Sequence, residues 1–296
     1  MPGQPNRQAP AVNRRRVGEY VVTYLGDGFL DGSFAYLAGI DEPAAKAMLV
    51  AAHRPPLAHF AIASYVIQGR GRTILVDGGA GGFNGWGGRF AEALATAGVT
   101  PEAVDTILLT HAHVDHVGGL VRDGAALFPA AELVVHEAEM RFWRDDAIMN
   151  SAPDDAKPFF LAARTAFDAY ARTLKPVSGG EVAPSITLAP LPGHTPGHSG
   201  YRIASGGEQL LIWADITHFA DIQIANPAVT VGFDVDQDQA RATRMRVLDE
   251  VASDRLAVAG MHFNMPGFMT VERHGSGYAK VDLPWLPALA QAALAQ

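Results

Sequence analysis

The chain has 296 residues, 48% of them hydrophobic, and a formal net charge of −8 at pH 7. This length and composition suffice for the core of one sizeable domain. The acidic balance disfavours nucleic acid and anionic membranes as partners, and the chain has no cysteine for disulfides or thiolate metal ligands. Its apolar runs are shorter than the roughly 18 residues that span a bilayer, and its start lacks the apolar core of a signal peptide. The cytoplasm is therefore the expected location.

Residues 1–16 are rich in Pro, Gln, Asn and Arg, which predicts a flexible N-terminal arm, with a dimer contact as the alternative. The remaining residues, 17–296, are predicted to form a single α/β domain. Within it the apolar patterning predicts a first strand over 19–25, a helix over 43–53 and a β-hairpin over 60–76.

A glycine-rich stretch over 78–88 follows the hairpin and Asp77. Its spacing fits neither the dinucleotide fingerprint nor the P-loop, so a nucleotide site is not expected. We expect the glycines to let the backbone pass close to a functional site. Phe83 and Trp86 within this stretch are candidates for a substrate pocket, with ordinary core packing as an equal alternative.

Three histidines and an aspartate stand within six positions just after the predicted strand 104–110. Alternate side chains of an extended segment point the same way, so His111 and His113 can converge on one metal ion. A turn into the next helix would carry Asp115 and His116 to the other side, where they could hold a second ion. Imidazole and carboxylate together suit zinc, iron, manganese or cobalt.

Three later segments supply matching side chains, each just after a predicted strand. The Pro/Gly-rich loop 191–200 carries His194 and His198, the strand 210–214 ends at Asp215, and the strand 256–261 ends at His262. A carboxylate has two oxygens and can bridge two cations, whereas an imidazole cannot. Asp215 is therefore the expected bridging ligand.

The segment at about 138–175 is predicted to be an aromatic-rich helical insertion, interrupted near 151–154. We expect part of it to shape a substrate pocket, with an amphipathic helix packed on the body as the alternative. His218, three residues after Asp215, could hydrogen-bond a substrate oxygen or protonate a leaving group, and a structural histidine is an equal alternative. Together with the residues named above, the pocket candidates are Phe142, Trp143, Phe219, Met265 and Phe268.

The order of these motifs, His-x-His-x-Asp-His, then Gly-His-Thr-Pro-Gly-His, then strand-Asp and strand-His, resembles the binuclear metallo-β-lactamase-fold hydrolases. The resemblance covers about 21–281. Within that superfamily, the Asp215 to His218 run and the tail after His262 look most like the methyl parathion hydrolases, relatives of the quorum-quenching lactonases. His218 departs from the acyl-homoserine lactonases, which have tyrosine at that position. The resemblance implies a four-layered αβ/βα sandwich with its site along one rim of the two sheets.

The resemblance also implies a ligand set for two divalent metal ions, with zinc expected and manganese, iron or cobalt as alternatives. By this likeness one ion is held by His111, His113 and His198, the other by Asp115, His116 and His262, and Asp215 bridges them. Asp77 and His194 are expected to support ligand rings through hydrogen bonds.

The implied reaction is hydrolysis by a metal-bridging hydroxide, with Asp115 and His218 as the catalytic candidates. An apolar pocket favours a small hydrophobic carboxylic ester, lactone or aryl phosphotriester as substrate. A glyoxalase-type thioester hydrolase and a β-lactamase share this chemistry and stay open, and a mononuclear iron oxidoreductase is the alternative from another class. A serine hydrolase is not expected, because the run 197–200 is not a Gly-x-Ser-x-Gly elbow. Neither nucleic acid nor membrane is an expected partner, and a homodimer is the alternative to a monomer.

Overall fold

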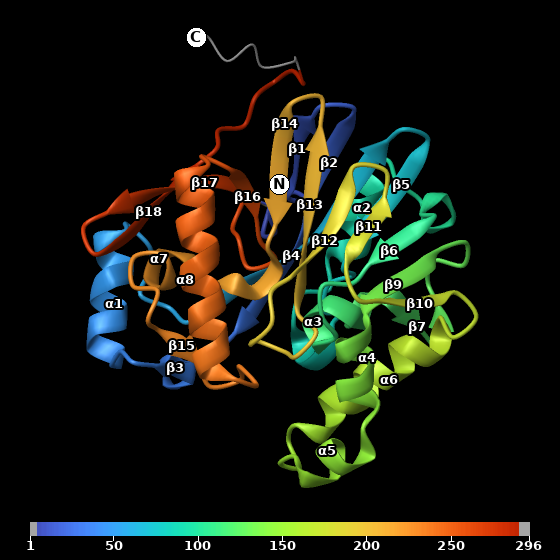
Figure 1. The fold of residues 1–296 in the computed structure, drawn as a ribbon, viewed down its shortest axis with the longest axis horizontal. Coiled ribbons are helices and arrows are strands. Elements are labelled where there is room, and N and C mark those ends of the chain that lie inside the picture. Colours follow the sequence, from blue (N-terminus) through green and yellow to red (C-terminus); the bar gives the residue numbers. More distant parts are fainter. Residues whose placement is uncertain (1–4, 290–296) are drawn as a thin grey trace.

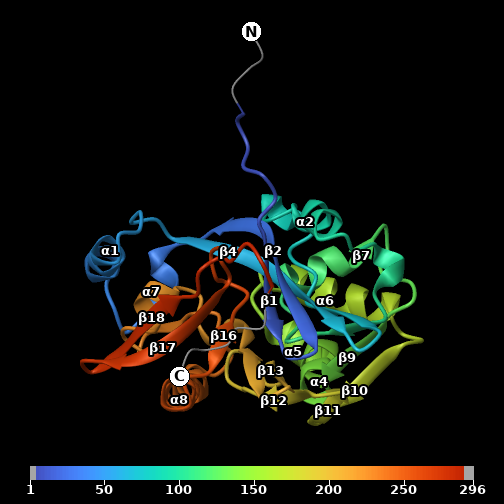
Figure 2. The ribbon, with the colours of Figure 1, turned by 90° about the horizontal axis from the view of Figure 1, so that it is seen from above.

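The computed structural model describes residues 5–289, which form two seven-stranded sheets packed face to face (Figures 1 and 2). In spatial order the first sheet contains β1 (Val12–Val17), β2 (Tyr20–Asp31), β4 (His59–Gly69), β5 (Arg72–Val76), β6 (Thr106–Leu108), β9 (Glu132–His136) and β10 (Leu174–Val177). The second contains β11 (Gly180–Ala183), β12 (Ile186–Pro190), β13 (Ser199–Ser205), β14 (Glu208–Ile212), β16 (Ala257–Ala259), β17 (Phe268–His274) and β18 (Gly277–Asp282). Two short pairs lie outside them, β3 (Leu37–Ala38) with β15 (Thr230–Val231) and β7 (Val121–Arg122) with β8 (Ala125–Ala126).

Helices cover the outer face of each sheet (Figure 1). The α-helices are α1 (Glu42–Ala51), α2 (Phe90–Thr96), α3 (Val114–Val117), α4 (Glu137–Arg144), α5 (Asp146–Ser151), α6 (Lys157–Ala169), α7 (Ala220–Gln223) and α8 (Gln237–Ser253). Short 3-10 helices are η1 (Phe34–Tyr36), η2 (Phe83–Gly85), η3 (Pro101–Ala103), η4 (Gly118–Leu120) and η5 (Ala214–Ile216). None of the helices formed by residues 5–289 has both the length and the apolar character needed to cross a bilayer.

Three layers of apolar side chains hold the sandwich together. One fills the space between the two sheets, where Tyr65 and Ile67 of the first sheet meet Tyr201 and Ile203 of the second. Another lies between the first sheet and helices α2, α4 and α6, and a third lies between the second sheet and α8. The order helix, sheet, sheet, helix is the predicted four-layered sandwich.

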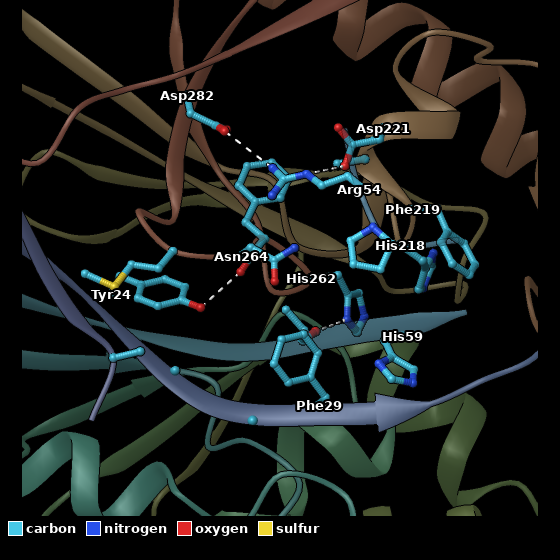
Figure 3. Close-up of a pocket in the computed structure, with 18 of the residues that line it drawn as sticks. Tyr24, Phe29, Arg54, His59, His218, Phe219, Asp221, His262, Asn264 and Asp282 are labelled. Carbon is cyan, nitrogen blue, oxygen red and sulfur yellow. Dashed lines mark hydrogen bonds and ion pairs between the residues drawn. The ribbon is translucent and has the colours of Figure 1, made fainter. Parts of the chain in front are cut away.

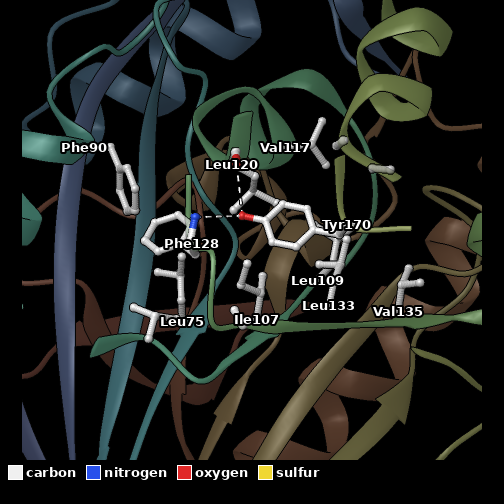
Figure 4. Close-up of a cluster of buried hydrophobic side chains, with 14 of the residues drawn as sticks. Leu75, Phe90, Ile107, Leu109, Val117, Leu120, Phe128, Leu133, Val135 and Tyr170 are labelled. Carbon is white, nitrogen blue, oxygen red and sulfur yellow. Dashed lines mark hydrogen bonds between the residues drawn. The ribbon is translucent and has the colours of Figure 1, made fainter. Parts of the chain in front are cut away.

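The apolar layer between the first sheet and helices α2, α4 and α6 includes the buried hydroxyl of Tyr170 (Figure 4). Tyr170 belongs to one apolar cluster with Leu75 of β5, Ile107 of β6 and Leu133 of β9, and its Oη donates to the Leu120 carbonyl at 3.0 Å. The same oxygen accepts the Phe128 N–H at 3.1 Å. The hydroxyl thereby gives the buried Phe128 N–H an acceptor and links it to the Leu120 carbonyl, which also accepts the Leu127 N–H at 2.9 Å.

The N-terminal arm is shorter than predicted, because 12–16 belong to strand β1. This strand pairs antiparallel with β2, from Val12 opposite Leu25 to Val17 opposite Tyr20. Its arginines suggested a solvated arm, but β1 is an edge strand, where charged side chains are tolerated and can discourage further pairing. Arg14 also donates to the Ala97 carbonyl at 2.7 Å, which fixes the strand against α2.

The neighbouring strands β5, β6 and β9 run parallel to one another, so their carboxyl ends meet at the same edge of the first sheet. They are buried on both faces, which explains their unbroken apolar runs. The predicted metal-binding loop begins directly after β6. Strands β14 and β16 of the second sheet are also parallel and bring the loops after them to the site.

Candidate metal centre

The loop after β6 is fixed by one buried carboxylate. Asp77, which follows β5, accepts the Thr110 backbone N–H at 2.8 Å and the Thr110 hydroxyl at 2.7 Å. It also accepts a hydrogen bond from His116 Nδ1 at 2.7 Å. Asp77 therefore joins the strand end to α3 and leaves Nε2 of His116 free to face the site.

Glycines allow the predicted close approach between the glycine-rich stretch and the metal-binding loop. Gly78 N–H donates to the His116 carbonyl at 2.7 Å. A Cβ on Gly118 would lie 2.2 Å from the Ala80 oxygen, and one on Gly119 would lie 2.1 Å from the Gly78 oxygen. No larger residue fits at these two positions without moving one of the backbones.

Five imidazoles surround a single carboxylate oxygen at the centre of the site. The Nε2 atoms lie at these distances from Asp215 Oδ2: His262 3.0 Å, His218 3.2 Å, His116 3.3 Å, His194 3.4 Å and His111 3.5 Å. One carboxylate oxygen cannot accept hydrogen bonds from so many rings at once. The arrangement is that expected of a carboxylate shared between cations.

The side chains fall into two groups on either side of Asp215. His113 Nδ1 lies 3.0 Å from His111 Nε2 and 2.9 Å from His194 Nε2, which makes the first group. Asp115, His116 and His262 make the second, with Asp115 Oδ2 3.6 Å from His116 Nε2 and 3.8 Å from His262 Nε2.

The two histidines of the 191–200 loop exchange the roles expected from the sequence. His198 does not face His111 and His113, because both of its ring nitrogens bind the backbone. Nδ1 donates to the Leu191 carbonyl at 2.7 Å and Nε2 accepts the Asp215 N–H at 3.0 Å. Burial lowers the pKa of His198 to about 4, so the ring is neutral and fits this bonding. His194 takes the position in the first group.

The other ligand rings are also oriented through their second nitrogen. His194 Nδ1 lies 2.8 Å from Asp234 Oδ1, and His262 Nδ1 donates to the Ala61 carbonyl at 2.7 Å. His111 Nδ1 lies 3.1 Å from the Thr110 hydroxyl. These bonds select the tautomer that presents an Nε2 lone pair to the centre.

Burial controls the charge of the first group. It lowers the pKa of His111, His113 and His194 well below the ordinary value, and neighbouring imidazoles lower it further. These rings are therefore neutral at neutral pH, which is the form that binds metal.

In the second group burial also disfavours the imidazolium, but carboxylates outweigh it. Asp215 is the main cause of a raised pKa in both His116 and His262, with Asp115 adding to the effect. Burial raises the pKa of Asp215 itself, but the surrounding imidazoles bring it well below the ordinary value. Positive charge is thus favoured at the point where a cation would sit.

The donor set fits divalent metal ions. Within 5–289, His116 Nε2 and Asp215 Oδ1 are buried polar atoms without a hydrogen-bond partner. In a centre so well bonded elsewhere, such atoms call for a ligand that is not a protein group. Imidazole nitrogens and carboxylate oxygens are ligands for zinc and neighbouring transition metals.

Glu139 on α4 is a buried acid that sequence reasoning missed. Its Oε1 accepts Ala112 N–H at 2.9 Å and Trp143 Nε1–H at 2.5 Å, and its Oε2 accepts the Thr195 hydroxyl at 2.6 Å and Gly197 N–H at 3.1 Å. One carboxylate therefore ties the loop that carries His111 and His113 to the loop that carries His194. The sequence feature that could have indicated a buried Glu139 is its position one helical turn before Trp143, on the same face of α4.

Asp234 and Arg244 form a second support that the sequence did not reveal. Arg244 is buried and donates to the carbonyls of Ile216 at 2.7 Å and Val229 at 2.7 Å. Its Nη2 lies 3.8 Å from Asp234 Oδ2, while the other oxygen of Asp234 orients His194. Arg244 and Asp234 are only ten positions apart, but the histidine they support comes much earlier in the chain.

A cavity of about 710 Å³ opens beside the second group, with His218 and His262 in its wall (Figure 3). Of the predicted pocket residues, Phe219 and Met265 line it. Phe29, Leu57 and Met265 are large apolar side chains that line the cavity and remain about half exposed, which gives it an apolar entrance. A cavity of this size and character suits a small hydrophobic molecule.

The other predicted pocket residues do not line this cavity. Phe83 and Trp86 pack against Phe159, with ring centroids 5.8 and 6.2 Å away. Phe142 and Trp143 pack on Phe160, and Phe268 lies in the core against Tyr65. Trp143 still contacts the centre, since its ring meets His113 edge to face at 5.3 Å.

Comparisons with known proteins agree with this geometry. The family model of the metallo-beta-lactamase superfamily matches residues 58–262. Metallo-beta-lactamase domain-containing protein 1 of Mus musculus is 48% identical over 63 residues, 21% of either chain. The uncharacterized protein YobT of Bacillus subtilis is 28% identical over 149 residues, 50% of this chain and 59% of that one. The match therefore spans only part of each of these relatives.

Two solved structures share nearly the whole fold. The hydrolase AbOPH of the beta-lactamase superfamily has a TM-score of 0.88 and 26% identity, over 95% of this chain and 100% of that chain. AidC, a dizinc quorum-quenching lactonase, also has a TM-score of 0.88, with 24% identity over the same shares of the two chains. The predicted four-layered fold is confirmed. Because the family model covers most of the chain and ends at the last metal-site histidine, the chain belongs to the metallo-β-lactamase superfamily, as its motif order predicted.

Proposed function

We propose that the chain is a binuclear metal-dependent hydrolase of small hydrophobic carboxylic esters or lactones, with aryl phosphotriesters as the alternative substrates. The observation that carries this proposal is the pair of histidine groups on either side of Asp215, beside a cavity with an apolar entrance. The neighbours described as a hydrolase and as a dizinc lactonase support the same reaction class.

Two bound divalent cations, with zinc expected, would supply Lewis acidity and lower the pKa of a water molecule towards neutrality. His111, His113 and His194 would hold one cation, Asp115, His116 and His262 the other, and Asp215 both. Asp77 and Asp234 keep the ligand rings oriented, so little rearrangement is needed when substrate enters.

We infer that His218 contacts the substrate. It lies in the cavity wall, and neither of its ring nitrogens has a hydrogen-bond partner within the described part of the chain. The ring is held by stacking on His262 at 4.8 Å and by the edge contact with Phe233 at 4.9 Å. Burial lowers the pKa of His218, so a neutral imidazole faces the cavity. Such a ring can donate a hydrogen bond to a carbonyl or phosphoryl oxygen without adding charge.

The test combines metal analysis with initial rates. We expect about two metal equivalents in the purified protein, and turnover of an aryl ester or an acyl-homoserine lactone that a chelator abolishes and added zinc restores. Rates on a paraoxon-type triester, a thioester and a β-lactam would rank the alternatives. One equivalent of iron with no hydrolysis of any substrate would contradict the proposal.

A further inference from the structure

A second cavity, of about 550 Å³, shares a wall with the first. Its other lining is mostly small or apolar and comes from α1, α7 and the β17–β18 hairpin, including Met48, Ala51, Ile224 and Tyr278. The residues that line both cavities, and so form the boundary, are Arg54, Ala220, Asp221, Lys280 and Asp282. The boundary is therefore almost entirely charged, between two spaces that are largely apolar.

The four charged side chains of this boundary form a closed ring of ion pairs, which we call the charged partition. Arg54 Nε lies 3.4 Å from Asp221 Oδ2, and Arg54 Nη2 lies 3.6 Å from Asp282 Oδ2. Lys280 Nζ lies 3.4 Å from Asp221 Oδ1 and 3.3 Å from Asp282 Oδ2. Figure 3 shows the Arg54 side chain reaching between the two aspartates, across the cavity from Phe29 and His59.

The charges of the partition balance, so it is a poor counter-ion for a charged ligand. Each cation contacts both carboxylates, and each carboxylate contacts both cations. An alkyl chain lying against these groups would remove water from them without replacing its hydrogen bonds, which is unfavourable. The partition should therefore stop an apolar chain that enters from the metal side.

We propose that the charged partition ends the substrate pocket and limits the length of the hydrophobic substituent that the enzyme accepts, with Arg54 as the residue that determines this specificity. This inference rests on the proposed function, because it concerns the substrate of the same site. Shortening Arg54 should open part of the boundary between the two cavities, so that the second cavity can receive the end of a longer chain. Arg54 is the best residue to change because it lies in the loop between α1 and β4 and is about one third exposed, at 36% of its side chain.

The experiment measures kcat/KM of the metal-loaded enzyme on p-nitrophenyl esters and lactones of increasing alkyl length, for wild type and Arg54→Ala. We expect kcat/KM of the wild type to fall once the alkyl chain exceeds a certain length. In the variant the ratio of long-chain to short-chain kcat/KM should rise by about tenfold for two further methylenes that become buried. Lys280→Met removes another member of the partition and should shift the same ratio in the same direction.

Arg70→Ala is the matched control. Arg70 is also a partly exposed arginine with an ion pair, to Glu19 at 3.6 Å, but it lies at the β4–β5 turn and does not line either cavity. It should keep the wild-type length profile. If folded Arg54→Ala and Lys280→Met both keep that profile, the partition does not limit chain length.

Calorimetric titration with alkanoates of short and long chain separates this inference from the proposed function. Tighter binding of the long alkanoate to Arg54→Ala than to wild type supports the partition even if no ester or lactone is hydrolysed. Absence of metal-dependent turnover in the wild type would contradict the proposed function alone.

Discussion

Replacing Glu139 by glutamine should loosen the first histidine group while keeping the size of the side chain. The carboxylate accepts four hydrogen bonds, two from the loop and helix at Oε1 and two from the 193–197 loop at Oε2. Glutamine keeps only one acceptor oxygen, so its amide NH₂ faces either the Ala112 and Trp143 N–H donors, or the Gly197 N–H and the Thr195 hydroxyl, which can turn to accept from it. Whichever way the amide turns, at least one backbone N–H loses its acceptor.

The size of the effect follows from these bonds. A hydrogen bond to a charged group contributes about 1.5–3 kcal/mol, so losing one or two of them costs about 1.5–6 kcal/mol. Part of this is recovered, because burial raises the pKa of Glu139 and the neutral amide is cheaper to bury. We therefore expect the free energy of unfolding to fall by about 2–4 kcal/mol.

Two assays check this prediction. Urea unfolding of the metal-free protein gives the free energy change, and metal analysis after dialysis against a limiting amount of chelator gives the number of ions retained. We expect Glu139→Gln to lose the metal of the first group preferentially, because His194 and the His111 loop are no longer tied together. Glu137→Gln on the same helix is the control, since the Glu137 side chain is 42% exposed and its ion pair within residues 5–289 is to Arg141. The reasoning is refuted if Glu139→Gln unfolds like this control and retains both metals.

Three further predictions concern the metals. His194→Ala should retain about one metal equivalent fewer than wild type, and His198→Ala should retain more metal than His194→Ala. His198→Ala should instead lower the free energy of unfolding by about 1–3 kcal/mol, because the Asp215 N–H loses its acceptor. Metal analysis and urea unfolding of both variants test this prediction. Asp215→Ala should bind metal weakly at both groups and lose turnover by orders of magnitude, and two retained metals with full activity would contradict the bridging role. Chelation should lower the free energy of unfolding by about 2.7 kcal/mol for each metal site, relative to protein at a hundredfold excess of free metal over Kd, and should lower the thermal midpoint accordingly. An unchanged midpoint in differential scanning calorimetry would show that the ions do not bind the folded state.

The sequence predicted most side chains of the candidate metal centre because each follows an apolar strand. The parallel strands β5, β6 and β9 place Asp77 and His111 at the same sheet edge, and β14 and β16 do the same for Asp215 and His262. A strand end is a strong local signal, since the change from an apolar run to polar residues is visible within a few positions. The fold followed from the same run of strands and from the order of the motifs.

The choice between His194 and His198 could not be read from the sequence in this way. Both histidines follow glycine in the same loop, and both are buried. What separates them is the partner of the second nitrogen, Asp234 for one and the Leu191 carbonyl for the other. Those partners are set by how α8 and the preceding loop pack, which no local pattern encodes.

Pocket residues were harder still, because aromatic composition does not say which way a ring points. Phe83, Trp86 and Phe142 pack with other aromatic rings, whereas the cavity is bounded by the N-terminal segment, β2, the loop before β4, the segments 218–221 and 262–265, and the last hairpin. These segments are far apart in the sequence. These segments come together only because β1 and β2 join the first sheet. The prediction of a free arm over 1–16 left β1 out of that sheet.

The hydrogen bonds around the ligand rings bear on how the metals bind. The rings of His111, His116, His194 and His262 are each held through Nδ1 by a carboxylate, a hydroxyl or a carbonyl. Side chains fixed in this way lose little conformational freedom when a metal binds, so more of the coordination energy remains as affinity. The buried but unpartnered Nε2 of His116 and Oδ1 of Asp215 add to this, because a cation relieves their lack of partners. The protein scaffold therefore prepares the centre before the metals arrive, and weakening any one of these supports should reduce metal affinity without removing a ligand.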